Sequence, residues 1–235
     1  MVATLINVAL VLVGSGVGLL FRNLISQRLM TTLTHALGLC VLGIGLGNLL
    51  GGQDTLCLVM CLAAGAGLGT AARLEQRLEG VGDRLRARLG GGAGDGRFTQ
   101  GFVSASLLFC VGAMAITGSL EAGLRGNYEI LLSKGVIDGV SAVSFAATMG
   151  MGVACSALPL LVYQGGLTLL AGWVGPYLPE EVVTEMSAAG GALIVAIALN
   201  MLELGKTRIQ VGNLLPAMFL PILYLPLADW LGGVL

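Results

Sequence analysis

Long uncharged runs are the feature that most limits what this chain can fold into. The chain has 235 residues, and its 12 Lys and Arg and 13 Asp and Glu are confined to short stretches. The uncharged runs between them are 1–21, 29–53, 55–72, 98–120, 139–179, 186–202 and 209–228. A helix needs about 20 consecutive apolar residues to cross a hydrocarbon core about 30 Å thick. The runs therefore predict a polytopic membrane protein built from helices.

The number of crossings follows from the lengths of these runs. The run 139–179 has 41 residues, which is too long for one crossing and suits two. We therefore predict an all-α fold of about eight transmembrane helices, forming a single transmembrane domain over 1–235. The expected limits are Ala3–Phe21, Leu33–Leu50, Thr55–Ala72, Gln100–Gly118, Gly135–Ala154, Ala157–Val174, Met186–Leu202 and Val211–Trp230.

The basic residues predict how the chain crosses the membrane. Ten of the 12 lie between spans 1 and 2, 3 and 4, or 7 and 8, whereas only Arg125 and Lys134 lie between spans 4 and 5. Short loops rich in Lys and Arg remain cytoplasmic. The sequence thus predicts a multi-pass protein of the bacterial inner membrane with both termini on the periplasmic side.

One substantial polar segment, 73–97, interrupts the apolar runs. Leu74, Leu78 and Leu85 fall near one helical face with Arg and Glu around them, which is typical of an amphipathic helix on a membrane surface. We expect a cytoplasmic helix followed by a Gly-rich linker over 90–96. Its arginines suit membrane lipid headgroups, whereas interleaved acidic residues and the absence of aromatic residues in this segment argue against nucleic acid.

An internal match at an offset of 153 aligns residues 31–49 with 184–202. Because spans 1 and 2 then correspond to spans 6 and 7, the two units would cross the membrane in opposite directions. This predicts inverted repeats of spans 1–3 and 6–8, a common construction in secondary transporters. Chance similarity between glycine-rich apolar segments is the alternative. Glycines at four-residue spacing also favour close helix packing and a homodimer.

Polar side chains inside the spans are the candidate functional residues, since an unpartnered polar group is costly in hydrocarbon. Asp138, Ser141, Ser144 and Thr148 follow one another at spacings of three or four residues, which places them along one stripe of a helix. A carboxylate followed by hydroxyl groups is suited to attract a cation and to replace its water. We therefore predict an ion pathway along span 5.

Helix-breaking residues follow this stripe and predict a broken helix around 150–159. Gly150 and Gly152 lie here beside Ser156, and a break would free backbone groups as ion ligands near the membrane interior or on its cytoplasmic side.

Gln164 in span 6 and Asn200 in span 7 are further embedded polar residues, and we expect them to complete the pathway from neighbouring helices. Each has a structural alternative, a hydrogen bond between helices. For Asp138 the structural alternative is an ion pair with Lys134 at the helix end. Serine and threonine in such helices commonly bond to their own backbone carbonyls.

The motifs needed for enzymatic catalysis are absent from the sequence. It contains one histidine, no pair of Asp or Glu within a span, no phosphate-binding glycine loop and no serine elbow. Cys57 and Cys61 lie one helical turn apart without a second ligand pair, so we expect no metal site. The sequence therefore predicts a protein that is not an enzyme and has no cofactor.

Four long segments resemble the YqgA/YdfK family of bacterial integral membrane proteins, a domain of unknown function. They are GFVSASLLFCVGAMAITGS (101–119), KGVIDGVSAVSFAATMGMGV (134–153), SALPLLVYQGGLTLLA (156–171) and GGALIVAIALNMLELGKTRIQVGNLLPA (190–217). The resemblance covers essentially the whole chain. It implies several membrane spans, a sodium channel or pump, and for some members an association with biofilm formation.

Two hypotheses of function follow from the sequence. The first is a channel or secondary transporter for a small ion, most favourably a cation such as sodium or a proton, with an anion or a small organic solute as alternatives. The second is a membrane scaffold or regulator that does not transport and acts through the Arg-rich cytoplasmic helix.

Overall fold

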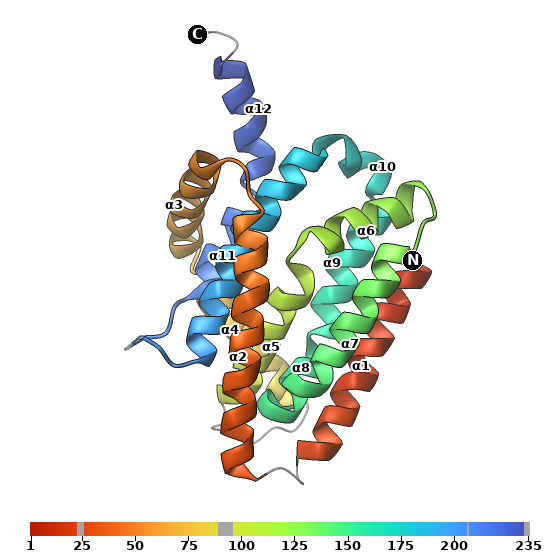
Figure 1. The fold of residues 1–235 in the computed structure, drawn as a ribbon, viewed down its shortest axis with the longest axis vertical. Coiled ribbons are helices and arrows are strands. Elements are labelled where there is room, and N and C mark those ends of the chain that lie inside the picture. Colours follow the sequence, from red (N-terminus) through yellow and green to blue (C-terminus); the bar gives the residue numbers. More distant parts are fainter. Residues whose placement is uncertain (23–25, 89–95, 206, 233–235) are drawn as a thin grey trace.

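The computed structural model describes residues 1–22, 26–88, 96–205 and 207–232, and these residues contain helices and connections without a strand (Figure 1). The predicted all-α polytopic fold is confirmed. The longer helices are α1 (Val2–Arg22), α2 (Gln27–Leu50), α3 (Thr55–Ala71), α4 (Leu74–Arg88), α5 (Gly96–Cys110), α6 (Ala113–Leu124), α7 (Glu129–Met149), α9 (Ala157–Leu169), α11 (Glu180–Met201) and α12 (Pro221–Gly232). The short elements are α8 (Gly152–Cys155), α10 (Ala171–Val174), η1 (Gly175–Tyr177) and η2 (Val211–Met218).

The described helices provide between five and eight membrane spans. Five are long and apolar enough to cross a membrane: α1, α2, α7, α8 continued by α9, and α11. Three further pairs bend at a short break, α3 and α4 by 59°, α5 and α6 by 58°, and η2 and α12 by 43°. Counting each pair as one span gives eight, in agreement with the predicted number.

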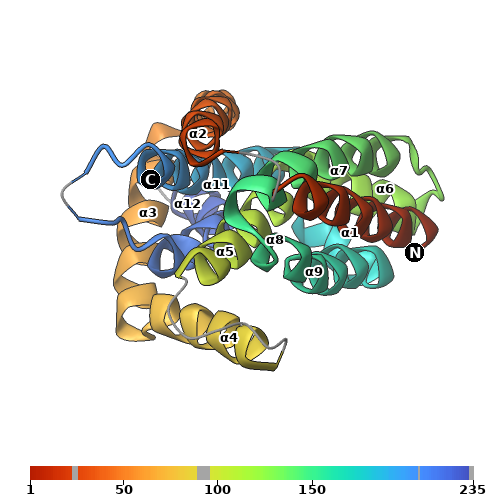
Figure 2. The same cartoon turned by 90° about the horizontal axis from the view of Figure 1, so that it is seen from below.

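The two ends of the bundle carry different connections. The last turn of α1, the first turn of α2 and α8 lie at one end, whereas the first turn of α1, the α6–α7 connection and α12 lie towards the other (Figure 1). Helix α4 lies at the edge of the bundle beside α5 in the view from below (Figure 2). The side of the membrane on which α4 and the termini lie stays a prediction. Lys206 lies outside the described residues, as does most of the predicted linker over 90–96.

Helices α1 and α7 run side by side through glycine contacts. A Cβ on Gly14 would overlap the carbonyl oxygen of Gly139, and one on Gly18 would overlap that of Val143. Small residues let two backbones approach closely in a membrane, where packing rather than water exclusion drives association. This contact brings Asn7 of α1 next to the first half of α7.

Helix α5 ends in the interior of the bundle, where the sequence did not predict a break. Val111 and Gly112 separate it from α6, and Gly112 has a φ of 121°, a value that residues with a Cβ rarely adopt. Phe109, in the last turn of α5, is fully buried. The break therefore exposes helix-end backbone groups inside the protein.

The predicted break around 150–159 is present but lies at the end of the bundle. Helix α7 ends at Met149, and Gly150 turns the chain with a φ of 85° beside the guanidinium of Arg22. A Cβ on Gly152 would overlap the carbonyl oxygen of Phe98, so α8 packs directly on α5. This segment is a turn between α7 and α9, and the interior break lies between α5 and α6.

The inverted repeat remains a prediction. Its two proposed counterparts, α2 and α11, pack against each other, and a Cβ on Gly45 would lie 2.7 Å from the backbone nitrogen of Val195. Where α2 ends and α11 begins, Glu185 Oε1 accepts hydrogen bonds from the backbone nitrogens of Gln53 at 2.7 Å and Asp54 at 3.0 Å. This contact holds the start of α3 against α11.

Candidate functional site

A buried ion pair lies near the middle of α7. Lys134 Nζ contacts Asp138 Oδ2, and the two side chains expose only 7% and 9% of their surface. Asp138 is the tenth of the 21 residues of α7. It therefore lies further from the start of its helix than in the predicted span, which begins at Gly135. Lys134, which was expected in a loop, points into the protein. The predicted pairing of these residues exists, but it lies in the interior.

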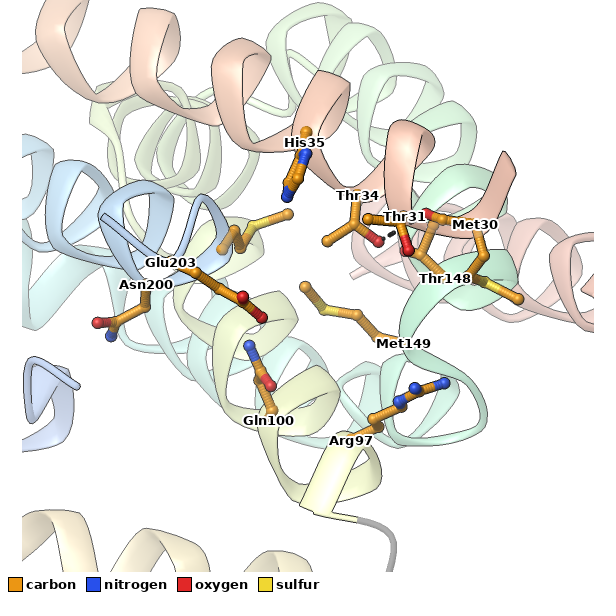
Figure 3. A pocket seen from close by; sticks show the side chains of 11 residues that line it. Met30, Thr31, Thr34, His35, Arg97, Gln100, Thr148, Met149, Asn200 and Glu203 are labelled. Atoms are coloured by element: carbon orange, nitrogen blue, oxygen red, sulfur yellow. Dashed lines mark hydrogen bonds between the residues drawn. The ribbon is translucent and has the colours of Figure 1, made fainter. Parts of the chain in front are cut away.

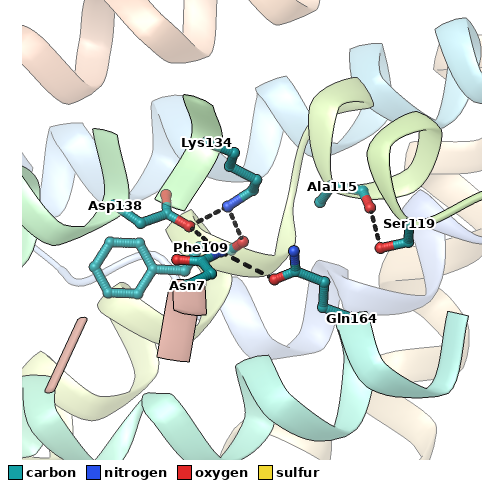
Figure 4. A network of polar contacts seen from close by, with 7 residues as sticks. All are labelled: Asn7, Phe109, Ala115, Ser119, Lys134, Asp138 and Gln164. Atoms are coloured by element: carbon teal, nitrogen blue, oxygen red, sulfur yellow. Dashed lines mark hydrogen bonds and ion pairs between the residues drawn. The ribbon is translucent and has the colours of Figure 1, made fainter. Parts of the chain in front are cut away.

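Neighbouring helices surround this pair with polar groups (Figure 4). Asn7 Nδ2 of α1 donates to Asp138 Oδ2 and to Gln164 Oε1 of α9, each at 3.0 Å. Thr168 Oγ1 donates to the Gln164 carbonyl oxygen at 2.8 Å. Asn7 and Gln164 are fully buried. Three helices thus position one carboxylate.

The interior end of α5 supplies a backbone ligand. Lys134 Nζ donates to the carbonyl oxygen of Phe109 at 2.7 Å. Carbonyls in the last turn of a helix lack an intrahelical partner and carry the negative end of the helix dipole. The first amide of α6, that of Ala113, already donates to Ser187 Oγ at 3.2 Å. The break therefore offers a ligand carbonyl oxygen atoms of the helix end more than free amide groups.

A pocket of about 180 Å³ opens onto the ion pair from the α2 side. Lys134, Asp138 and Ser141 of α7 line it together with Asn48 of α2 and Gly112 at the α5–α6 break. The ion pair therefore borders a space outside the packed core.

A second pocket, of about 250 Å³, lies between the first turns of α2 and the last turns of α7 and α11 (Figure 3). It is formed by the same helices α2, α5 and α7, together with α11. Thr34, Gln100, Thr148 and Asn200 provide polar side chains. The two pockets thus lie at different heights along the contact between α2, α5 and α7, which we call the three-helix seam.

The apolar part of this seam separates the two pockets. Val41 lies seven residues after Thr34 and seven before Asn48, which places all three on one face of α2. Phe145 occupies the equivalent level on α7, between Ser141 and the second pocket. Val41 and Phe145 are both buried in the main hydrophobic cluster. Buried apolar residues of α2 and α7 thus lie at the levels between the two pockets, which we call the two chambers.

The predicted stripe on α7 is divided between these chambers. Ser141 lines the first and Thr148 the second, with Ser144 half-buried between them. Thr148 Oγ1 donates to the carbonyl oxygens of Ser144 and Phe145, each at 3.1 Å. Its hydroxyl hydrogen is therefore used within its own helix.

Other predicted residues lie away from the ion pair. Ser156 Oγ donates to the Val153 carbonyl oxygen at 2.6 Å and belongs to the turn after α8. Asn200 exchanges two hydrogen bonds with the backbone of Ile209, at 2.8 and 2.9 Å. It fixes the connection after α11, a structural role that differs from the expected hydrogen bond between helices. Gly150 and Gly152 are likewise turn and packing residues.

Sequence reasoning missed Asn7 and the carbonyl group of Phe109. Asn7 is the one amide residue in the first uncharged run, and this isolated polar residue is the signal that was available. A backbone carbonyl leaves no signal, because any residue supplies one. Only the break after α5 makes that of Phe109 available.

The family described as "Protein of unknown function (DUF554)" matches residues 2–225. The chain belongs to this family. The resemblance found in the sequence is thereby confirmed, because the members below carry the same two names. The match includes every helix that contributes to the ion pair.

Two members of the DUF554 family are similar to the chain over nearly its whole length. The "Uncharacterized membrane protein YdfK" of Bacillus subtilis (strain 168) is 29% identical over 225 residues, which is 94% of each chain. The "Uncharacterized protein YqgA" of Escherichia coli (strain K12) is 28% identical over 218 residues, 92% of each chain. No solved structure matches the chain. With its apolar helices, the protein is a multi-pass membrane protein.

Proposed function

We propose that this protein is a secondary transporter of a small monovalent cation, such as sodium, in the bacterial inner membrane. The observation that carries the proposal is the buried pair of Lys134 and Asp138 beside the interior end of α5. The cation would bind to the carboxylate of Asp138 after entering through the pocket lined by Ser141.

The burial of this pair supports a functional role. Two charges lose their hydration in the interior, and replacing such a pair with apolar residues of similar size is often neutral or stabilising. Ionisable residues inside a membrane are rare and mark ion or substrate pathways. The pair therefore contributes little to stability. It is suited to a site whose charged partner changes during function.

The ligand atoms favour a cation over an anion. Asp138 contributes a carboxylate, Phe109 a helix-end carbonyl and Asn7 an amide oxygen that has no hydrogen-bond partner. Carboxylate and carbonyl oxygens are ligands of hard cations. An anion would need several free amide or cationic groups, whereas Lys134 is neutralised by Asp138 and the Ala113 amide is bonded to Ser187. Among the described side-chain amides of this network, Gln164 Nε2 alone is a buried donor without a partner.

The two chambers favour a transporter over an open channel. A channel needs a continuous polar route, whereas buried apolar side chains such as Val41 and Phe145 lie at the levels between the two pockets on α2 and α7. In an alternating-access mechanism, helices rearrange around a central site so that only one side is open at a time. The interior break between α5 and α6 is the type of helix discontinuity found in such transporters.

Ion flux into liposomes tests the proposal. Purified protein is expected to carry sodium or another single monovalent cation above the rate of empty liposomes, and Asp138→Asn is expected to lower that flux about tenfold or more. Charge-assisted contacts contribute about 1.5–3 kcal/mol, and about 1.4 kcal/mol corresponds to a factor of ten. Glu129→Gln is the matched control, because it neutralises an exposed carboxylate in the first turn of the same helix.

The combined variant Lys134→Met with Asp138→Asn covers the case in which Asp138→Asn alone fails to fold. It removes both charges and is expected to fold without transporting. Wild-type flux that persists in this folded variant would exclude Asp138 as the cation ligand. Flux of chloride or of an organic solute, with none of any cation, would replace the cation hypothesis with the corresponding alternative.

A scaffold role remains the second candidate because α4 presents arginines to the outside. Arg84 and Arg88 are exposed on this helix, which lies at the edge of the bundle beside α5 (Figure 2). A scaffold would require these arginines and tolerate neutralisation of Asp138, whereas a transporter requires Asp138. Binding to vesicles containing anionic lipid, measured for Arg84→Gln with Arg88→Gln, separates the two roles.

A further inference from the structure

We infer that the second chamber is a further cation-binding site, in which the carboxylate of Glu203 is the charged ligand. The inference rests on the proposed function and adds to it a second binding position for the same small monovalent cation, away from Asp138. Glu203 follows α11 and lines this chamber. Its carboxylate points into the chamber in the close view (Figure 3).

The backbone of Glu203 has a conformation that normally belongs to glycine, with a φ of 54°. The Glu203 nitrogen donates to the carbonyl oxygen of Asn200 at 3.4 Å. The next nitrogen, that of Leu204, donates to the carbonyl oxygen of Leu199 at 3.3 Å. These two bonds form a Schellman motif, whose left-handed residue is usually glycine because a Cβ is unfavourable there. A glutamate at this position therefore costs stability relative to glycine, and residues held in such conformations cluster at functional sites.

The surroundings of this turn keep the carboxylate of Glu203 at the chamber. Asn200 exchanges two hydrogen bonds with the backbone of Ile209, which ties the connection after Glu203 back to α11. Glu203 also lines a neighbouring pocket of about 410 Å³, together with Gln100 and Thr207. The carboxylate thus lies where this pocket and the second chamber adjoin, in the position that a cation moving between them would pass.

The hydroxyl groups of the second chamber present oxygen lone pairs to a ligand. Thr34 Oγ1 donates its hydrogen to the carbonyl oxygen of Met30 at 2.9 Å, and Thr148 Oγ1 also donates within its own helix. A hydroxyl has one hydrogen and two lone pairs, so both oxygens can still accept. Together with the carboxylate of Glu203 and the amide oxygen of Gln100, they form a set of oxygen ligands suited to a hard cation.

The other charged groups near Glu203 favour weak binding. Arg97 and His35 also line the chamber, and Arg208 lines the neighbouring pocket. Both arginines are exposed, where salt screens their charge, and Figure 3 shows Met149 between Glu203 and Arg97. Among the residues that the structure describes, none forms an ion pair with Glu203. A binding position on a transport route must also release its ion, so we expect lower affinity here than at Asp138.

Substitutions of Glu203 separate a cation ligand from a turn residue. Glu203→Gly removes the carboxylate and supplies the residue that the left-handed position favours, so we expect the unfolding temperature to rise by about 2–4 °C. We expect the cation concentration that gives half-maximal flux to rise about three- to fivefold in the same variant. Glu203→Asp keeps the carboxylate and should recover part of this loss. A structural role alone would predict unchanged flux in Glu203→Gly.

Direct binding isolates the second chamber, because Asp138→Asn removes the first site. Sodium NMR relaxation, which detects weak binding, is measured on the purified full chain in detergent. Asp138→Asn is expected to retain sodium binding at lower affinity than the wild type, and Asp138→Asn with Glu203→Gln is expected to lose it. Asp138→Asn with Glu129→Gln is the matched control and should bind sodium as Asp138→Asn does. Lys134→Met with Asp138→Asn replaces Asp138→Asn as the background if that variant does not fold.

The possible failures are distinguishable. Wild-type sodium binding that disappears completely in the Asp138→Asn background would overturn the second site and leave the proposed function standing. Binding in that background that survives Glu203→Gln would exclude Glu203 as its ligand. A less stable Glu203→Gly variant with unchanged half-maximal concentration would make Glu203 a turn residue. An absence of both sodium binding and cation flux in folded wild-type protein would contradict the proposed function and the second site with it.

Discussion

Replacing Asp138 with leucine is expected to lower the free energy of unfolding by about 3–5 kcal/mol, because the charge of Lys134 is then buried without a partner. The lysine exposes only 5% of its surface, and its remaining described partner is the carbonyl oxygen of Phe109. Thermal unfolding in detergent, followed by circular dichroism, measures the change. This loss of stability is distinct from the loss of transport, because it is measured on the protein without a bound cation.

The double variant Lys134→Met with Asp138→Leu separates a missing contact from an uncompensated charge. Replacing both members of a buried pair with apolar residues is often neutral or stabilising, so we expect the double variant to recover most of the stability lost in Asp138→Leu. Equal losses in the single and double variants would show that packing around α7, and not charge, governs the effect.

Replacing Gly14 with valine is expected to destabilise the protein by about 1–3 kcal/mol, the usual cost of forcing extra atoms into a packed contact. The new Cβ would overlap the carbonyl oxygen of Gly139 and lie 3.4 Å from the Cβ of Ala142. Helices α1 and α7 must then separate. Because Asn7 reaches Asp138 from α1, we also expect cation transport to fall.

Gly16 provides a control with the same chemistry. It lies in the same helix two residues later, and a Cβ placed on it would meet nothing within 4 Å. Gly16→Val therefore changes helix propensity as Gly14→Val does, without the contact between backbones. If the two variants unfold at the same temperature, the close approach of α1 and α7 is not a determinant of stability.

Glycine positions show how far sequence reasoning extends in this protein. The four-residue spacing of Gly14 and Gly18 predicted a packing face, and that face contacts α7. The spacing does not identify the partner helix, because a stripe of small residues can pack against any helix with a complementary backbone surface. The break at Gly112 went unpredicted for a related reason. It lies in an uninterrupted apolar segment, and glycine is common within the spans of this chain.

The sequence by itself determined the membrane class, the segregation of basic residues to alternate connections and the family, and it predicted about eight spans. These properties depend on apolar length and charge order, which are set along the chain. It also singled out Asp138, since a carboxylate inside an apolar segment is visible without a structure. The tertiary structure alone decided its surroundings. Asn7 and Gln164 are hydrogen-bonded although they lie 157 residues apart in the sequence. Helix packing and the break after α5, rather than local spacing, place oxygen atoms around the charge of Lys134.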